Sequence, residues 1–393
     1  MPRGHSRAAG ALLQAQSRRA SSLLAASALL LFSLWGPLTA HPADYEWVLP
    51  RGFPEPAVPA DNPMSESKVQ LGRKLFYEER LSATGTHSCA TCHQQAKAFS
   101  DGRAQAAGIH GDLHPRSAMA IVNVAYNPRF QWANPELHTL EQQASRPLYN
   151  EQPIEMGMRG READVIAAFR KDEHYAQLFA AAFPEDNEPV RIDNVLRALA
   201  SFERTLISGR SAFDRYVFDD DRGALTEDAR RGMALFFSDR AGCAQCHSGI
   251  NFSGPVVHAN GPEAEPVFVN TGLYNTDGTG RYPDKDPGAE ATTRRARDHG
   301  RFRVPTLRNV AVTAPYMHDG SVPTLDAVID HYSVGGRQTP LGPSVRNRYR
   351  DTKVRPLALT PQERRALIAF LSSLTDEGFL ADPRFSDPDA AAR

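Results

Sequence analysis

The clearest chemistry in this sequence lies in two copies of the pattern Cys-x-x-Cys-His. They contain all four cysteines of the chain: Cys89 and Cys92 with His93, and Cys243 and Cys246 with His247. In this pattern the two thiols add to the vinyl groups of a haem, and the adjacent histidine becomes the proximal ligand of the iron. A zinc site would need further sulfur or nitrogen ligands, and no other cysteine can supply them. The pattern therefore predicts two covalently bound haem c groups, with zinc or a redox dithiol as the weaker alternatives.

The N-terminal residues have the composition of an export signal. Basic residues precede an apolar stretch at residues 23–35, and Ala40 is a small residue suited to a cleavage site. We therefore expect residues 1–40 to be a signal peptide and the mature protein to be periplasmic. The apolar stretch is shorter than the roughly 20 residues that span a bilayer, so no stable membrane span is expected.

Length and charge narrow the class of protein. The 45 basic and 46 acidic residues nearly cancel, which does not favour binding to nucleic acid. A chain of 393 residues is long enough for two domains, and one domain per haem is the natural division. We expect an N-terminal domain at residues 41–210, a C-terminal domain at 211–380, and a frayed tail at 381–393.

The segments that precede the two haem motifs are alike. Residues 72–80 and 232–240 match in Gly, Leu, Phe and Arg at an offset of 160 residues, and both have helical periodicity. Two ordinary amphipathic helices would explain the apolar spacing but not the shared position before a haem motif. The similarity therefore indicates a duplicated module.

Other elements are also mainly helical. Helical periodicity recurs at residues 162–169, 192–207 and 361–374, where Thr360 suits an N-cap and Pro361 the first turn. Residues 251–303 are rich in Gly, Pro and Asp, which predicts a long irregular connection. The expected fold class is mainly α, with two cytochrome c-like domains, each binding one covalent haem c, and long irregular loops.

Further segments, in the same order, resemble the bacterial di-haem cytochrome c peroxidases and their MauG-like relatives. They are Phe-Ser-Asp-Gly at 99–102, Asn-Val-Ala-Tyr-Asn at 123–127, Leu-Glu-Gln-Gln-Ala at 140–144, Glu-Met-Gly at 155–157 and the block at 304–320. The resemblance covers about residues 65–375 and is strongest to the MbnH branch, on residues 114–119, 137–141 and 198–206. It implies a first haem open to peroxide and a second, six-coordinate haem that stores or relays an oxidising equivalent.

An iron that reacts with peroxide needs an open distal position and a group that moves protons. Glu155 matches the distal glutamate of the family, with a surface carboxylate as the alternative reading, and Pro147 matches a proline of the MauG-like distal pocket. Many relatives carry a histidine that blocks the first haem. His110 lies near that position but is expected to be a surface residue, with His114 as the other choice.

The resemblance also implies residues for the second haem. Tyr332, fourteen residues after His318, stands where the peroxidases carry methionine and the MauG and MbnH relatives carry tyrosine. A phenolate favours oxidised iron. His331 and Met317 are rival ligands. Trp132 matches the tryptophan between the two haems, where it would relay electrons, although a buried aromatic of purely structural role is the alternative.

A calcium ion between the haems is a further implication of the resemblance. Thr313 and Pro315 match the backbone carbonyl ligands of the family, and such oxygen ligands suit a hard cation. The third ligand is open, because relatives carry an asparagine where this chain has Ser117. Ser117, Asn123 or a water molecule would then supply the oxygen.

The sequence thus predicts an exported haem-dependent oxidoreductase of the peroxidase type. It would react with hydrogen peroxide to form a high-valent di-haem state and then oxidise a protein partner, as MauG and MbnH do. By resemblance to the MbnH branch, that partner would be a copper-binding protein whose tryptophan is oxidised. The alternative is a cytochrome c peroxidase that detoxifies hydrogen peroxide with electrons from a small cytochrome c or a cupredoxin. A non-enzymatic di-haem electron carrier is the third hypothesis.

Overall fold

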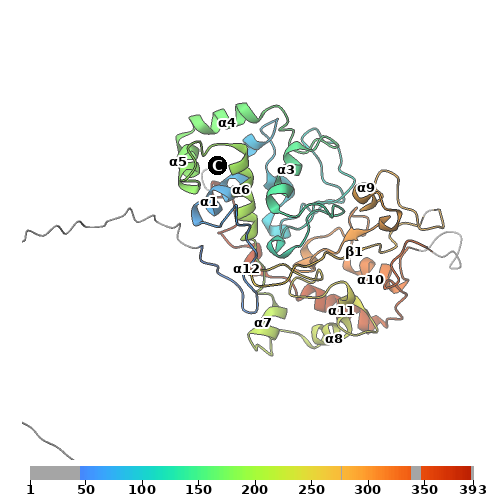
Figure 1. Ribbon diagram of the computed structural model, residues 1–393. Helices are drawn as coiled ribbons and strands as arrows, with labels where there is room; N and C mark the ends of the chain where they lie inside the picture. The colour runs from blue at the N-terminus through green and yellow to red at the C-terminus, as the bar shows by residue number, and fades with distance from the viewer. Residues whose placement is uncertain (1–44, 276, 338–346, 391–393) are drawn as a thin grey trace, which may run out of the picture. The chain divides into compact units, whose positions relative to one another are not determined.

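The computed structural model describes residues 45–275, 277–337 and 347–390, which form helices joined by irregular loops (Figure 1). The helices of the first half are α1 (Glu66–Phe76), α2 (Cys89–Cys92), α3 (Leu140–Tyr149), α4 (Glu162–Lys171), α5 (Glu173–Ala182) and α6 (Ile192–Arg204). Those of the second half are α7 (Ala212–Phe218), α8 (Glu227–Phe236), α9 (Glu290–Thr293), α10 (Leu325–Ser333), α11 (Pro361–Ser372) and α12 (Glu377–Leu380). The mainly helical fold class is confirmed.

Strand is scarce in the described part of the chain. A two-residue strand β1 (Phe268–Val269) pairs antiparallel with β2 (Phe302–Arg303), and Phe268 lies opposite Arg303. Between them only α9 and the 3-10 turn η5 (Ala296–Asp298) are regular. The irregular connection predicted at residues 251–303 is therefore confirmed. No helix within the described residues is long and apolar enough to cross a bilayer, and the predicted signal peptide lies outside these residues.

Two helix pairs organise the molecule, α1 with α6 and α8 with α11 (Figure 1). The helices of each pair meet at a glycine. A Cβ atom added at Gly72 would lie 1.8 Å from the carbonyl oxygen of Ala198, and one added at Gly232 would lie 1.9 Å from that of Ala366. Only a glycine allows this close approach, so the duplicated module predicted from the sequence is confirmed.

Aromatic side chains fill the space beside each crossing. Phe76 of α1 lies 5.3 Å from Phe202 of α6, and Phe236 of α8 lies 5.0 Å from Phe370 of α11, measured between ring centroids. These rings belong to two separate hydrophobic clusters, one in each half. The apolar periodicity of these helices is therefore explained by two repeated cores.

A second pair of equivalent residues ties a loop to the end of each main helix. Asn123 and Asn309 both adopt the left-handed backbone conformation, with φ of 58° and 60°, and each opens a 3-10 turn, η3 (Val124–Tyr126) and η6 (Val310–Val312). The amide of Asn123 donates to the carbonyl of Leu206, and that of Asn309 donates to the carbonyl of Leu374. The duplication therefore extends beyond the helices.

The helix ends follow from local sequence. Thr360 caps α11, where its side chain accepts from the amide of Glu363 and the Glu363 carboxylate accepts in return, while Pro361 opens the first turn. The helices predicted at residues 162–169, 192–207 and 361–374 are all present. Helix α6 ends before residue 207, because the amide of Ile207 bonds to the carbonyl of Thr205 instead of continuing the helical ladder.

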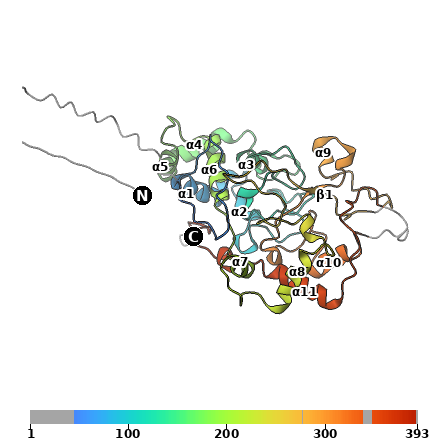
Figure 2. The same cartoon turned by 60° about the horizontal axis from the view of Figure 1, so that its bottom comes forward.

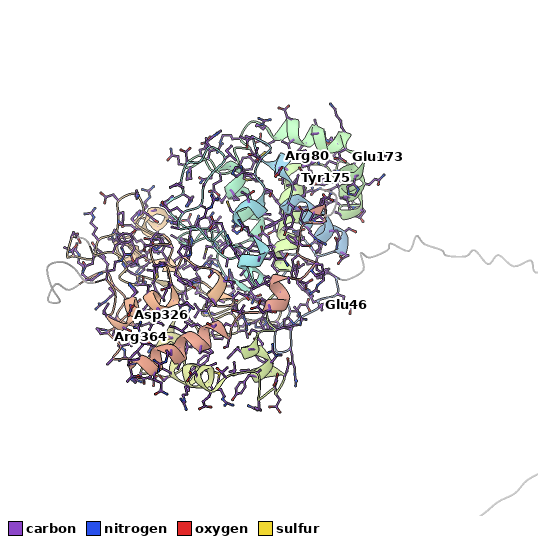
Figure 3. All side chains as sticks on the ribbon, turned by 180° about the vertical axis from the view of Figure 1, so that it is seen from behind. Glu46, Arg80, Glu173, Tyr175, Asp326 and Arg364 are labelled. Atoms are coloured by element: carbon purple, nitrogen blue, oxygen red, sulfur yellow. The ribbon has the colours of Figure 1, made fainter. Side chains whose placement is uncertain are left out.

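Long polar side chains bind neighbouring helices together at the outer face of each half (Figure 3). In the first half the guanidinium of Arg80 lies 4.7 Å from the ring centroid of Tyr175 on α5. In the second half Arg364 of α11 donates to the carbonyl of Asp326 on α10 at 3.4 Å. These contacts lie away from the glycine crossings and connect the outer elements to the central helix pairs.

The frayed tail that we predicted from Asp382 onward is instead packed on the first half, up to residue 390 (Figure 1). Phe385 is only 6% exposed and joins the hydrophobic cluster of that half. Its carbonyl accepts from the hydroxyl of Tyr77 at 2.6 Å, and Asp389 pairs with Lys74 at 2.5 Å. The prediction failed because the tail is rich in charged residues and proline, which suggest a frayed segment, while its one aromatic residue, Phe385, packs on the first half.

The predicted domain boundary, between residues 210 and 211, is followed at once by a helix. Helix α7 begins at Ala212 and lies beside α8 and α11 in Figure 2. The carboxylate of Asp376 accepts from the Ser208 hydroxyl at 3.1 Å and from the amides of Gly209 and Arg210. Residues 42–393 form one compact unit, so the division into two domains remains a prediction.

Candidate haem sites

Each Cys-x-x-Cys-His pattern forms a short helical turn that ends at its histidine. His93 follows α2 and His247 follows the 3-10 turn η4 (Cys243–Gln245). The Nδ1 atom of His93 lies 2.7 Å from the carbonyl oxygen of Phe99, and that of His247 lies 2.8 Å from the carbonyl oxygen of Phe252. A carbonyl only accepts, so Nδ1 carries the proton and Nε2 is left as the metal-binding atom.

The two carbonyls reach their histidines because the backbone turns sharply at each phenylalanine. Phe99 has φ of 60° and Phe252 has φ of 50°, values that bulky residues rarely adopt. Both side chains are fully buried, and their packing holds this conformation. Burial also lowers the pKa of both histidines, which keeps the imidazoles neutral and suited to binding iron.

The residues around the second motif fit a haem. A cavity of about 260 Å³ is lined by Cys243, Cys246 and His247, and Tyr332 of α10 also faces it. The four cysteines, all within the described residues, form no disulfide. Burial raises the pKa of Cys243 to about 11, so its sulfur is a neutral thiol in apolar surroundings. Such a thiol suits a thioether bond better than a thiolate–zinc site.

Arg303 is a feature of this cavity that our reading of the sequence missed. It is 7% exposed and lines the cavity, yet within the described residues it has no carboxylate partner. Its Nε donates to the carbonyl of Gln131 at 3.1 Å, and Nη2 lies 3.4 Å from the sulfur of Met119. Burial lowers its pKa to about 10. A buried cation without a counter-ion is costly, and an anionic group such as a haem propionate would satisfy it.

Trp132 lines the same cavity as Tyr332 and His247. Its indole Nε1 donates to the carbonyl of Ser117 at 2.9 Å, and its own carbonyl accepts from the amide of Arg303 at 2.7 Å. The ring is therefore held at both its polar edge and its backbone. This geometry suits a fixed aromatic between two redox centres, and the relay role remains a prediction.

Among the residues of α10 that line the cavity, Tyr332 carries the polar side chain, and burial raises its pKa above the usual value. Its neighbour His331 is buried elsewhere, with Nε2 3.0 Å from the carbonyl of Thr271. Met317 also lines the cavity, on a backbone with φ of 69°. The hydrogen bond of His331 favours Tyr332 over its nearest rival as the ligand.

Helices α3 and α10 are equivalent elements of the two halves, and they differ at one position. Thr139 caps α3 and Thr324 caps α10, each by accepting from a backbone amide of the first turn. Eight residues after these caps stand Pro147 and Tyr332. Where the second half offers a phenol, the first half offers a side chain that cannot bind a metal.

Glu155 lies beside Pro147 in the first half, because the amide of Met156 donates to the Pro147 carbonyl at 3.1 Å. Its carboxylate accepts from the side-chain amide of Asn150 at 2.8 Å. Burial raises the pKa of Glu155, although that hydrogen bond opposes the shift. The Nε2 atom of His114 lies 3.9 Å from the carboxylate. The residues that surround Glu155 therefore favour proton transfer over a permanently charged surface role.

The loop histidines differ in their surroundings. His110 is exposed, whereas His114 is half-buried and its pKa is lowered by burial. From the sequence we considered His114 only as a residue that could block the first haem. The structure adds its contact with the Glu155 carboxylate, which no sequence signal indicated because the two lie 41 residues apart.

The predicted calcium ligands lie partly together. Ser117, Thr313 and Pro315 all line the cavity. The side-chain nitrogen of Asn123 donates to the Ser208 carbonyl at 2.9 Å, and its side-chain oxygen accepts from the Ser208 amide at 2.7 Å. Because this oxygen is already bonded, Ser117 is the better source of a third calcium ligand. Within the described residues, no group of three or more His, Cys, Asp or Glu side chains could hold a metal ion. A cation would therefore depend on carbonyl and hydroxyl oxygens.

Comparisons with known proteins agree with this geometry. The profile of the di-haem cytochrome c peroxidase family matches residues 66–222, and that of the RoxA-like, cytochrome c-like family matches residues 302–333. The chain is 36% identical to the methylamine utilization protein MauG of Methylorubrum extorquens, over 84% of this chain and 83% of MauG. It is 35% identical to the cytochrome-c peroxidase IdrP1 of Denitromonas iodatirespirans, over 82% of this chain and 85% of that protein.

A solved structure is also similar over most of its length. A MauG-like protein associated with microbial copper homeostasis superimposes with a TM-score of 0.83 and 46% sequence identity. The match covers 88% of this chain and 99% of that chain. The shared fold therefore extends over most of both chains.

Proposed function

This chain belongs to the di-haem cytochrome c peroxidase and MauG family, and from that premise we propose that it is an exported enzyme that uses hydrogen peroxide to oxidise a protein partner. It is a haem oxidoreductase, as its relatives are. Two haems bound at the Cys-x-x-Cys-His motifs supply the reduction of peroxide and hold its two oxidising equivalents. The observation that carries the proposal is the contrast between Pro147 and Tyr332.

In this proposal, the contrast between Pro147 and Tyr332 gives the two sites different roles. Pro147 offers no ligand atom, so a haem held by His93 would keep its other axial position open to peroxide. Tyr332 supplies a hard phenol oxygen to the second site, which favours oxidised iron. The arrangement suits an enzyme that retains oxidising power until a large partner binds, because a methionine at the same position would instead stabilise reduced iron and favour fast electron transfer.

Glu155 moves the protons of the reaction in this proposal. Its carboxylate takes the proton from the near oxygen of peroxide and delivers it to the departing oxygen, which leaves as water. Asn150 orients the carboxylate through its 2.8 Å hydrogen bond. His114, 3.9 Å away, shields the same carboxylate from other partners.

Trp132 connects the two sites. Its carbonyl and its indole nitrogen are both held by backbone partners, so the ring keeps its position when it gives up an electron. An indole is among the side chains that lose one electron most easily. Arg303, which donates its amide to the Trp132 carbonyl, would hold a propionate of a haem in the cavity.

The partner we propose is a small exported copper-binding protein that carries an oxidisable tryptophan. This inference rests on the copper homeostasis association of the structurally similar MauG-like protein. In the same proposal residues 1–40 are removed on export, and the mature protein works in the periplasm. A calcium ion held by oxygens of Ser117, Thr313 and Pro315 would stabilise the region between the sites.

The optical spectrum after peroxide is added to the fully oxidised holoenzyme tests this function. We expect a long-lived near-infrared band shared between the two haems, which decays when an oxidisable protein partner is added. Rapid steady-state turnover with reduced cytochrome c, beginning only after half-reduction, would instead establish a peroxide-detoxifying enzyme. Absence of any high-spin ferric signal in the electron paramagnetic resonance spectrum would leave only an electron carrier.

The variant Tyr332→His sharpens the test. An imidazole would still bind the second iron, so both haems should remain attached by mass spectrometry. We expect the near-infrared band to be lost while peroxide still reacts at the first site. His331→Gln is the matched control, because this neighbour of Tyr332 does not line the cavity and bonds to the backbone carbonyl of Thr271, and it should retain the band.

A further inference from the structure

A column of rings in contact with one another, two contacts stacked and one T-shaped, leads away from the cavity in the second half. The rings of Phe302 and His318 are stacked 3.6 Å apart with an interplanar angle of 14°, and both residues line the cavity with Trp132. Tyr282 lies against His318 at 6.0 Å, and Tyr274 lies 5.1 Å from Tyr282. Trp132 packs against the hydrophobic cluster formed by Tyr282 and Phe302. The column therefore joins the proposed relay to Tyr274.

The outer end of the column is a phenol bonded to a carboxylate. The hydroxyl of Tyr274 donates to Oδ2 of Asp319 at 2.6 Å, while Oδ1 of Asp319 accepts from the amide of Ser321. Both Tyr274 and Asp319 are half-buried, whereas Tyr282 is buried. A tyrosine loses an electron far more readily when an acceptor for its proton is already in place. The geometry thus provides the proton acceptor at the ring that lies furthest from the cavity.

We infer that Tyr274 is the site at which oxidising equivalents leave the enzyme, as a tyrosyl radical that an external one-electron donor then reduces. This inference rests on the proposed function, because the oxidant is the peroxide-oxidised enzyme. The electron lost by Tyr274 passes by way of Tyr282 to the oxidised centre, and the phenolic proton moves to Asp319. The donor, an aromatic phenol or indole, returns one electron to Tyr274, and the proton returns from Asp319.

Two repeats of this step account for all the electrons and protons that one peroxide consumes. One hydrogen peroxide accepts two electrons and two protons and leaves as two waters. Both electrons come from donor groups, one at a time through Tyr274, and each oxidised phenol or indole releases one proton to water, which replaces the two protons that peroxide takes up. No reductant other than this donor is required, and neither Tyr274 nor Asp319 is consumed.

The first half contains a matched pair that lacks the connection. Tyr175 donates to the carboxylate of Glu78 at 2.7 Å, nearly the distance of the Tyr274 bond. Its ring lies 4.7 Å from that of Phe169, which is hard to oxidise, and Arg80 lies over its face (Figure 3). Tyr175 does not line the cavity. It therefore provides the same hydrogen bond without the column.

The experiment compares the holoenzyme with Tyr274→Phe and Tyr175→Phe, each mixed with peroxide in the presence of a nitroso spin trap. Peptide mass spectrometry then locates the adduct. We expect the native enzyme and Tyr175→Phe to carry the adduct on Tyr274. Tyr274→Phe should lose that adduct, and without a donor its oxidised state should decay more slowly. The inference would be overturned if Tyr274→Phe formed the same adducts as the native enzyme on all its other residues and its oxidised state decayed at the same rate.

A second variant keeps the test decisive if removal of the hydroxyl disturbs folding. Asp319→Asn retains a hydrogen-bond partner for Tyr274 but accepts no proton, so the Tyr274 adduct should be largely lost while two haems remain attached. An undiminished adduct would count against the phenol–carboxylate pair. Failure of the native enzyme to form any oxidised state with peroxide would refute the proposed function instead, so the two failures are distinguishable.

Discussion

The two halves of this molecule share a scaffold and differ in the residues that it presents. Gly72 and Gly232 allow the same close helix contact, and Asn123 and Asn309 tie a loop to the end of the main helix in the same way. The scaffold is therefore repeated down to individual hydrogen bonds. The chemistry is not repeated, since α3 carries Pro147 where α10 carries Tyr332.

The irregular connection adds a second difference between the halves. It supplies Tyr274, Tyr282 and Phe302, which form the ring column together with His318. In the first half the corresponding aromatic cluster is built mainly from phenylalanine. In our proposal, the two copies of this repeated frame differ in role through the residue at the position of Pro147 and Tyr332 and through the irregular connection, while the helix pairs stay alike.

The largest effect is expected from removing the difference between Pro147 and Tyr332. Pro147→His would place an imidazole at the position of α3 that corresponds to Tyr332, where it could bind the first iron. We expect peroxide to stop reacting and the high-spin ferric signal to disappear, as judged by optical and electron paramagnetic resonance spectra. Arg146→His, an exposed neighbour on the same helix, is the control and should react normally. Normal reaction of Pro147→His would refute the equivalence.

A buried ion pair in each half gives the next comparison. Arg308 is fully buried and makes two bonds to Asp214, at 2.8 Å and 3.0 Å. Arg204 bonds to Glu141 but has one Nη atom without a partner. Removing one member of a buried pair costs about 3–5 kcal/mol, so Arg308→Met should lower stability by about that amount. Arg204→Met should cost less, because Glu141 is more exposed than Asp214. Equal shifts in the thermal unfolding midpoint would contradict this ranking.

The helix crossings test how closely the halves match. Gly72→Ala and Gly232→Ala would each force a methyl group against a carbonyl oxygen of the facing helix. Overpacking of this kind costs about 1–3 kcal/mol, and the two variants should show similar losses in unfolding midpoint. Gly223→Ala is the control, because its nearest neighbour atom lies 3.5 Å away. A large effect in one half alone would show that the crossings are not equivalent.

The smallest expected effect is a difference in pH dependence. Glu203 of α6 is 7% exposed, and burial raises its pKa to about 8, whereas the equivalent residue of α11 is Leu371. A raised pKa favours the protonated, folded form. The stabilisation is therefore present below the ordinary glutamate pKa and is lost as the pH rises through about 8.

Glu203→Gln should remove that loss. The unfolding midpoint of the native holoenzyme should fall between neutral and mildly alkaline pH, and that of the variant should fall less. Glu185→Gln, at an exposed position, should follow the native curve. Parallel curves for Glu203→Gln and the native protein would show that Glu203 is paired in the holoenzyme.

Local patterns predicted much of the fold. The caps at Thr360 and Pro361 fixed the start of α11, and apolar periodicity located α4 and α6. The C-terminal segment was misjudged, because the burial of Phe385 depends on a surface of α1 more than 300 residues earlier in the chain. Periodicity carries no information about such distant contacts.

The sequence by itself determined the two Cys-x-x-Cys-His motifs and with them the prediction of two attached haems, because the spacing of two thiols and a histidine is a local requirement. It also supplied the family, and with it Glu155, Trp132 and Tyr332 as expectations. Only the tertiary structure brought Arg303 to the cavity with no carboxylate partner among the described residues, and joined Tyr274 to Asp319, 45 residues away. Both features arise from the packing of segments that are distant in the sequence. The burial of Arg303 and the hydrogen bond between Tyr274 and Asp319 form only when those segments have packed.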